Sequence, residues 1–267
     1  MTDFNFKESY NFYDLVEIMA LLRRPGGCPW DREQTHESIK KNLIEETYEV
    51  IEAINKKSPD MLCEELGDLL MQAVFHAQME SESGSFDIDD VADGICKKLI
   101  VRHPHIFGDD KASSVEEVLT NWDEIKMKTK GQKSFSSSIN SVPRELPALM
   151  RSEKIQKKAR DAGLDFDSLT ATLEKTEEEM KELKAAIENS DRENIEEEIG
   201  DLLFSTVNVS RFLHIDPEEA LTKSTDKFAK RFALLEEMAA ERGVDMKKAS
   251  LEELDEIWNE VKKSEAR

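Results

Sequence analysis

The feature that most constrains this chain is an internal repeat. The motif EExxE at 45–49 returns at 178–182, and EELGDLL at 64–70 returns as EEIGDLL at 197–203. Both matches have an offset of 133 residues, so neither copy carries an insertion between its two motifs. Later blocks keep the same order, because KLIVR is followed by WDEIK in the first copy and KFAKR by WNEVK in the second. Four ordered matches indicate a tandem duplication of one structural unit.

Helical periodicity dominates both copies. Apolar residues recur at spacings of three and four, and alternating β-branched runs are almost absent. The pattern predicts an all-α fold, a tandem repeat of two helical-bundle domains at residues 1–127 and 147–267 joined by a serine-rich linker at 128–146. The expected helices span residues 8–23, 37–56, 60–82, 88–102, 115–127, 147–161, 168–189, 192–213, 217–242 and 251–264.

The overall charge limits the classes of partner. A formal net charge of −21 argues against binding to a nucleic-acid polymer, which depends on basic surfaces. It also repels free phosphates, so a phosphate ligand would need a local cation, and a divalent metal ion suits a carboxylate-rich chain. No apolar run approaches the roughly 20 residues that span a bilayer, and the N-terminus does not resemble a secretory signal. We therefore expect no membrane association and a cytoplasmic location.

The repeated motifs place carboxylates on adjacent helices. Glu179 and Glu182 are three residues apart, as are Glu198 and Asp201, so each pair occupies one face of its helix. The connecting stretch is long enough for a turn into an antiparallel helix, and four carboxylates would then converge. Like charges this close are unfavourable unless a cation binds, and Mg²⁺, with Mn²⁺ as a substitute, suits such oxygen ligands. The corresponding acids of the first copy are Glu46, Glu49, Glu65 and Asp68.

Apolar residues flank these acids at helical spacing. They include Leu66 and Leu70 in the first copy and Ile199 and Leu203 in the second. The pattern predicts that the carboxylates lie beside a buried apolar seam. The alternative is a solvated acidic helix face, because EExxE on its own is common on exposed helices.

Basic and aromatic residues recur downstream of the acids. Lys227 and Arg231 lie one helical turn apart and could bind phosphate oxygens, and Trp258 with Lys262 could offer a stacking surface and a further cation. The alternatives are an exposed basic stripe and a tryptophan in the core. Combined with the acids, these residues indicate a ligand that joins a triphosphate to a base. The first copy has Lys98, Arg102, Trp122 and Lys126 at the matching positions.

The sequence lacks the motifs of a protein nucleophile. It has no Walker A, GxGxxG or GxSxG pattern, and its three cysteines are far apart and outside any CxxC arrangement. A metal-activated water is therefore the expected attacking group. Three alternatives stay open: an acidic helical protein that only binds partners, a phosphohydrolase that releases single phosphates, and a di-iron protein. The last is disfavoured because the ExxH spacing at Glu33 and His36 has no second copy.

The chain resembles the MazG nucleoside triphosphate pyrophosphohydrolases over nearly its whole length. The resemblance rests on GGCPWDREQTHESI at 26–39, EETYEVIEAI at 45–54, RHPHIFGD at 102–109, VPRELPALMRSEKIQKKA at 142–159 and EEEIGDLLF at 196–204. It implies two all-α pyrophosphohydrolase domains and hydrolysis of nucleoside triphosphates between the α and β phosphates, which gives the monophosphate and pyrophosphate. It further implies broad base tolerance, a role in clearing the nucleotide pool, and a homodimer.

Position by position, the resemblance also implies roles for individual residues. The metal ligands fall on Glu179, Glu182, Glu198 and Asp201. The nucleotide contacts fall on Lys175, Lys227, Arg231, Trp258 and Lys262. Glu178 or Glu179 would orient or deprotonate the attacking water, while Lys175 would help to stabilise the departing pyrophosphate. In two-domain members the C-terminal copy is the active one, and Lys175 corresponds to Asn42 in the first copy. Because Glu46, Glu49, Glu65 and Asp68 are all present, we expect metal binding in the first copy, and we leave its catalysis open.

Overall fold

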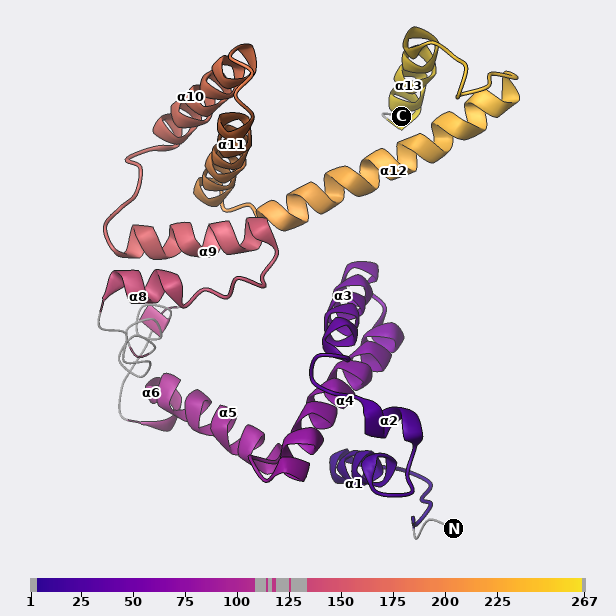
Figure 1. Cartoon of the computed structure of the whole chain (residues 1–267), viewed down its shortest axis with the longest axis vertical. Coiled ribbons are helices and arrows are strands. Elements are labelled where there is room, and N and C mark those ends of the chain that lie inside the picture. The colour runs from indigo at the N-terminus through magenta and orange to yellow at the C-terminus, as the bar shows by residue number, and fades with distance from the viewer. Residues whose placement is uncertain (1–3, 109–113, 115–116, 119–124, 126–133, 266–267) are drawn as a thin grey trace. The chain divides into compact units, whose positions relative to one another are not determined.

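The computed structural model of the chain describes residues 4–108, 114, 117–118, 125 and 134–265 (Figure 1). It forms two compact units, Met1–Lys126 and Met127–Arg267, and each is described by itself below. Every regular element among the described residues is a helix. The all-α fold with two repeated units is therefore confirmed. No helix in the described part of the chain is both long enough and apolar enough to cross a membrane.

Unit 1 is organised around a pair of antiparallel helices. Its helices are α1 (Phe12–Arg23), α2 (Pro29–Glu33), α3 (Lys40–Lys56), α4 (Pro59–Ser83), α5 (Ile88–Arg102) and α6 (Pro104–Phe107). Helices α3 and α4 pack side by side, and α1 packs against α4 (Figure 1). The turn between α3 and α4 is tight because Lys57 adopts a left-handed conformation at φ 53° and Ser58 caps α4 through Met61 N–H.

Unit 2 repeats this helix pair. Its helices are α8 (Phe135–Asn140), α9 (Ala148–Asp161), α10 (Leu169–Glu188), α11 (Arg192–Phe212), α12 (Pro217–Glu241) and α13 (Leu251–Glu265). Helices α10 and α11 pack side by side as α3 and α4 do (Figure 1). Their turn again has a left-handed residue, Ser190 at φ 55°, followed by Asp191, which caps α11 through Asn194 N–H. Equal spacing in sequence has therefore produced the same local geometry twice.

The helix boundaries differ from the predicted ones where side chains cap them. Helix α1 begins at Phe12 rather than residue 8, because Asn11 and Asp14 form a capping box there. The short helices α2 and α6 begin at prolines and were not predicted, and α8 lies inside the segment predicted to be a linker, where Ser134 caps it. The helix predicted over 115–127 falls largely outside the described residues, as do Trp122 and Lys126.

The buried cores lie beside the helix pairs. In unit 1, α1 and α4 enclose a cluster that includes Met19, Val74 and Phe75. In unit 2, α12 and α13 enclose a second cluster around Leu235 and Val261. Each such side chain contributes roughly 1.5–3 kcal/mol when fully buried. These clusters fix α4 and α12, the longest helices of the two units.

The predicted apolar seam beside the acids is only partly buried in the single chain: Leu69 and Leu202 are half-buried, whereas its other large side chains are exposed. Leu66 and Leu70 on α4 are 48% and 43% exposed, and Ile199 and Leu203 on α11 are 46% and 54% exposed. The prediction of burial at these positions is therefore wrong for the isolated chain. These four side chains remain largely open to solvent on the acid-bearing helices. Exposed apolar surface of this kind is typical of surfaces that contact another protein.

Candidate functional site

The acids of unit 2 converge where α10 and α11 run side by side. Glu179 and Glu182 come from α10 and Glu198 from α11, and one carboxylate oxygen of each lies within 4.8 Å of the others. Helical spacing explains the convergence, because residues three apart share a face and the antiparallel partner presents its own acid to that face. Glu179 is buried, Glu198 is half-buried and Glu182 is exposed. The set is therefore open to solvent on one side.

Lys175 contacts this acid set directly. Its Nζ lies 2.9 Å from Glu179 Oε1 and 3.0 Å from Glu178 Oε1. These hydrogen bonds, that to Glu179 first, raise the pKa of Lys175 above its usual value. The lysine is therefore a fixed positive charge one helical turn before Glu179. The structure brings together three residues that the sequence predicted to act in catalysis, Lys175, Glu178 and Glu179.

The electrostatics of the set favour a cation. Burial raises the pKa of Glu182, with a further contribution from its hydrogen bond to Glu179. Burial likewise raises the pKa of Glu198, as do the neighbouring charges of Glu182 and Glu179. Burial is the main cause of both shifts, and repulsion from the neighbouring carboxylates adds to it. A divalent cation among them would remove that repulsion, and all the available ligand atoms are oxygens, which suit Mg²⁺.

Unit 1 contains a second acid set of the same form. Glu46 and Glu49 come from α3 and Glu65 from α4, again with one oxygen of each within 4.8 Å of the others. Burial and the charge of Asp68 raise the pKa of Glu46, and burial and the charge of Glu49 raise that of Glu65. The two units thus share both the geometry of the acids and the electrostatic need for a cation.

The fourth predicted ligand of each set lies beside the compact group of three. Asp68 and Asp201 do not belong to the groups whose oxygens lie within 4.8 Å of one another. They are close enough for their charges to raise the pKa values of Glu46 and Glu198, respectively. The aspartate side chain is one methylene shorter than glutamate, which accounts for its place at the edge of each set.

The remaining predicted nucleotide contacts are on two other helices. Lys227 and Arg231 lie one turn apart on α12, and Trp258 and Lys262 lie one turn apart on α13. The Trp258 ring packs against the core of α12 and α13, with its centroid 5.3 Å from that of Phe228. The structure therefore brings Lys175 to the acids and places the other four residues on α12 and α13.

Two polar features of the acid-bearing helices were not predicted. Gln72 on α4 is only 5% exposed, and its Nε2 donates to Glu46 Oε1 at 3.5 Å. Its place four residues after Asp68, on the same face of α4, is the signal that could have revealed it.

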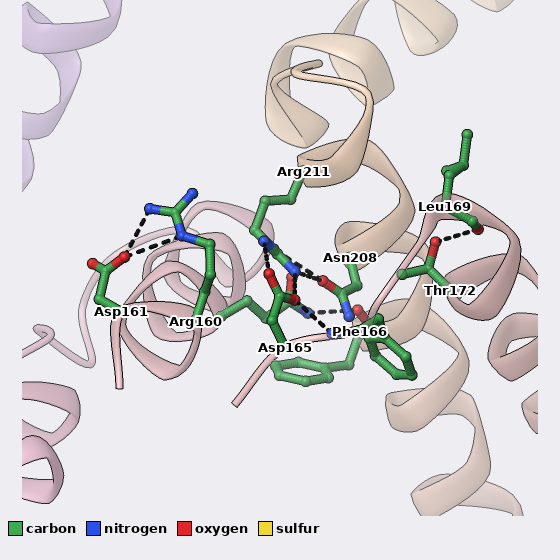
Figure 2. A network of polar contacts seen from close by, with 10 residues as sticks. Arg160, Asp161, Asp165, Phe166, Leu169, Thr172, Asn208 and Arg211 are labelled. Carbon is green, nitrogen blue, oxygen red and sulfur yellow. Dashed lines mark hydrogen bonds and ion pairs between the residues drawn. The ribbon is translucent and has the colours of Figure 1, made fainter. Parts of the chain in front are cut away.

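The second feature is a buried network that joins α11 to the loop before α10 (Figure 2). Arg211 Nη1 donates to Asp165 Oδ2 at 3.1 Å, a second guanidinium nitrogen pairs with the other oxygen, and Nε donates to Asn208 Oδ1 at 2.9 Å. Burial opposes ionisation of Asp165, but the hydrogen bonds from Arg211 and from Phe166 N–H lower its pKa below the usual value. The network positions the chain that enters α10, the helix of Lys175 and Glu179.

A cavity of about 360 Å³ lies beside this network, between α9 and α11. Its lining is mainly apolar, with Phe166 and Phe204 among its walls, and it includes none of the acids of the set. This cavity is thus separate from the carboxylates.

Comparisons with known proteins agree with these observations. The family model described as the MazG nucleotide pyrophosphohydrolase domain matches residues 34–107 and 167–233, one match in each unit. The nucleoside triphosphate pyrophosphohydrolase/pyrophosphatase MazG of Thermotoga maritima is 49% identical over 251 residues, which cover 94% of this chain and 95% of that protein.

Two further relatives cover the chain almost completely. The nucleoside triphosphate pyrophosphohydrolase of Escherichia coli K12 is 45% identical over 254 residues, 94% of this chain and 97% of that protein. The uncharacterized protein YabN of Bacillus subtilis is 47% identical over 97% of this chain, which matches 53% of the YabN length. Each of the two segments that match the family model contains one acid set. The identity to the Thermotoga maritima and Escherichia coli proteins extends over most of the chain. The chain therefore belongs to the MazG nucleotide pyrophosphohydrolase family.

Proposed function

We propose that this chain hydrolyses nucleoside triphosphates to the nucleoside monophosphate and pyrophosphate at the acid set of unit 2. The observation that carries the proposal is the convergence of Glu179, Glu182 and Glu198, with an oxygen of each within 4.8 Å of the others and Lys175 bound to the same group. Membership of the family, and the names of the Thermotoga maritima and Escherichia coli relatives, support the same activity.

The donor set fits a magnesium ion. Glu179, Glu182, Glu198 and Asp201 would hold it, with Mn²⁺ as a substitute, because both ions favour carboxylate oxygens. When bound, the ion would supply charge for the phosphate oxygens and lower the pKa of a coordinated water. The closeness of the three carboxylates supports this assignment, because the charges of neighbouring acids add to the raised pKa values of Glu182 and Glu198.

The remaining steps of the reaction would depend on side chains of this protein. Glu178 is exposed, and its Oε1 already accepts a hydrogen bond from Lys175, so Glu178 or Glu179 can orient or deprotonate a water that attacks the α-phosphorus. The bond from the α-phosphorus to the bridging oxygen then breaks, and pyrophosphate leaves with that oxygen. Lys175, with Lys227 and Arg231 from α12, would neutralise its charge. Trp258 and Lys262 would contact the base and a phosphate.

Product analysis tests this proposal. The purified chain is incubated with Mg²⁺ and a panel of nucleoside triphosphates, and pyrophosphate, phosphate and monophosphate are measured. We expect pyrophosphate and monophosphate in equal amounts from several bases, and at least a hundredfold loss of rate in Glu182→Gln. Release of single phosphate would identify a different phosphohydrolase, and no product at all would identify a binding protein. An unchanged rate in Glu182→Gln would show that the acid set of unit 2 is not the active site.

The breadth of substrates and the assembly belong to the same proposal. A site that binds mainly the triphosphate, as the carboxylates and cations indicate, would accept several bases and suit the clearing of a cytoplasmic nucleotide pool. The exposed apolar side chains Leu66, Leu70, Ile199 and Leu203 support a homodimer that covers them.

A further inference from the structure

The cavity between α9 and α11 has the size and lining of a small-molecule site. Its volume of about 360 Å³ falls within the range of roughly 300–1,000 Å³ that is typical of ligand pockets. The walls are mainly apolar, and the aromatic rings of Phe166 and Phe204 are among them. Both rings are partly exposed, and Leu164, another lining residue, is 77% exposed. A small molecule can therefore reach the cavity from solvent.

One lining residue carries a buried polar atom that has no partner. Gln156 is 5% exposed, and its Nε2 donates to the carbonyl oxygen of Phe204 at 2.8 Å. This bond fixes the orientation of the amide, because a reversed amide would place two oxygens together. The other end, Oε1, is buried and accepts no hydrogen bond from any residue that the structure describes. A ligand that donates one hydrogen bond to Gln156 would relieve this unfavourable burial.

The charged residues of the lining are already paired with each other. Arg211 donates to both carboxylate oxygens of Asp165 and to Asn208 Oδ1 (Figure 2). Asp165 and Arg211 are the two charged residues among the described residues that line the cavity, and their charges offset one another. A neutral ligand is therefore favoured, because a charged one would lose its water without gaining a counter-ion.

The same features favour an aromatic ligand with few polar groups. Contacts between aromatic rings are more favourable than the burial of their area alone, so Phe166 and Phe204 favour a flat ring. A nucleobase carries several polar groups, and most of them would lose water against apolar walls without finding a partner. A ring system with a single N–H group, such as an indole, avoids most of this cost.

We propose that the cavity between α9 and α11 binds a neutral aromatic molecule with a single N–H donor, of the indole class, and that this donor pairs with Gln156. The site is separate from the acid set, and the proposed hydrolysis does not require it. The bound ring would contact Phe166, in the segment that leads into α10, and would stabilise unit 2 because it binds only the folded chain.

Isothermal titration calorimetry of the full-length chain with indole tests the inference. Benzofuran, which has an oxygen in place of the N–H group and nearly the same shape, is the matched probe. In buffer that contains a chelator and no nucleotide, we expect one indole site per chain. Benzofuran should bind about three- to tenfold more weakly, the usual effect of losing one hydrogen bond. No indole site, or equal affinities for the two probes, would overturn the inference.

A substitution of Gln156 tests the role of its amide. Gln156→Met keeps the length of the side chain and removes its polar atoms. We expect the indole affinity of this variant to fall to that of benzofuran, and the benzofuran affinity to stay as it is in the unmodified chain. A preference for indole that persists in Gln156→Met would show that another group accepts the hydrogen bond, which contradicts the proposal.

A pair of bulkier variants locates the site. Ala159 lines the cavity, so Ala159→Leu should abolish indole binding. Ala148→Leu is the same change at an exposed position of α9 and should leave the indole affinity unchanged. Circular dichroism spectra of both variants check their folding. Unchanged indole affinity in Ala159→Leu would exclude this cavity as the site.

The concentration of the chain distinguishes a ligand site from a surface that a second copy fills. We expect the indole affinity to be independent of chain concentration. An affinity that falls as the chain concentration rises would show that a second copy occupies the cavity, and would overturn the inference. Because these titrations contain neither nucleotide nor metal ion, their outcome does not depend on whether the chain hydrolyses triphosphates.

Discussion

Lys175 is the residue whose side chain most clearly separates the two acid sets. It contacts Glu178 and Glu179 at 3.0 and 2.9 Å, and the pKa of its ammonium is raised by those bonds. A group held this way is charged throughout the physiological range of pH. It can therefore serve as a fixed cation for a phosphate that displaces one of its glutamates, without a change in protonation.

Replacement of Lys175 should reduce hydrolysis more than it reduces stability. Lys175→Gln removes the cation nearest the acids, and we expect kcat/KM for pyrophosphate release to fall about 10²–10³-fold, as when one electrostatic donor to a transition state is lost. Lys181→Gln is the matched control, because Lys181 is an exposed lysine of the same helix outside the acid set. Similar losses in both variants would show that general surface charge, not the placement of Lys175, is responsible.

At the scale of elements, the Arg211 network explains how the entry to α10 is held. Asp165 belongs to the segment between α9 and α10, and Arg211 stands near the end of α11 (Figure 2). The guanidinium is 6% exposed and the carboxylate 24% exposed, so water screens this pair only partly. The pair therefore couples the position of α10 to that of α11, the two helices that carry the acids.

Breaking this pair should destabilise unit 2. Asp165→Asn leaves a buried arginine without its partner charge, and we expect the free energy of unfolding to fall by about 2–4 kcal/mol. Asp161→Asn breaks the exposed pair between Arg160 and Asp161 in the same region and should cost less than about 1 kcal/mol. Urea denaturation of both variants measures the difference, and equal stabilities would show that the network is not a structural anchor.

A histidine pair in unit 1 makes its stability depend on pH. His36 Nδ1 and His76 Nδ1 are 2.6 Å apart, and His36 Nε2 is 2.7 Å from Glu80 Oε1. Burial, together with the charge of His36, lowers the pKa of His76 from its usual value near 6.5. The unfolded chain therefore takes up this proton at a higher pH than the folded chain does. It follows that the free energy of unfolding decreases as the pH falls below about 6.5.

This dependence should disappear in a variant without the buried imidazole. We expect the melting temperature of His76→Phe to fall less between pH 7.5 and pH 5.5 than the melting temperature of the unmodified chain. Glu80, whose pKa is lowered by bonds from Ser85 and His36, contributes mainly below this window. The control is His214→Asn, a change at an exposed left-handed position that asparagine tolerates. If the melting temperatures of His76→Phe and the unmodified chain fall equally, the histidine pair does not set the pH dependence.

Elements with strong periodicity and capping residues could be predicted from the sequence, and those that depend on tertiary contacts could not. The α10–α11 pair was predicted to within one residue at each end, because its caps Ser168 and Asp191 lie at the ends of apolar periods. Helix α8 was not predicted, since its serines are also typical of a linker. Gln72 and the Arg211 network were also missed, because neither recurs at the matching positions of the other copy.

At the scale of the whole molecule, the duplication leaves each unit with an apolar face that its own core does not use. The side chains concerned lie on the same helices as the acids: Leu66 and Leu70 on α4, and Ile199 and Leu203 on α11. Burying one such leucine contributes roughly 1.5–3 kcal/mol. A second copy of the chain that covers these faces would therefore also restrict the access of water to the acids.

We predict a dimer that a single added charge can weaken. Light scattering on the unmodified chain should give twice the mass of the 30.6 kDa chain, whereas Leu203→Glu should shift the distribution toward the monomer, since a carboxylate would have to be buried without a partner. Leu251→Glu is the control, because Leu251 is 75% exposed at the start of α13 and lies on neither acid-bearing helix. A monomeric unmodified chain would contradict the prediction. A dimer unaffected by Leu203→Glu would show that the interface does not include this part of α11. If Leu203→Glu instead lowers both the dimer fraction and pyrophosphate release, then association and catalysis depend on the same face of the α10–α11 pair.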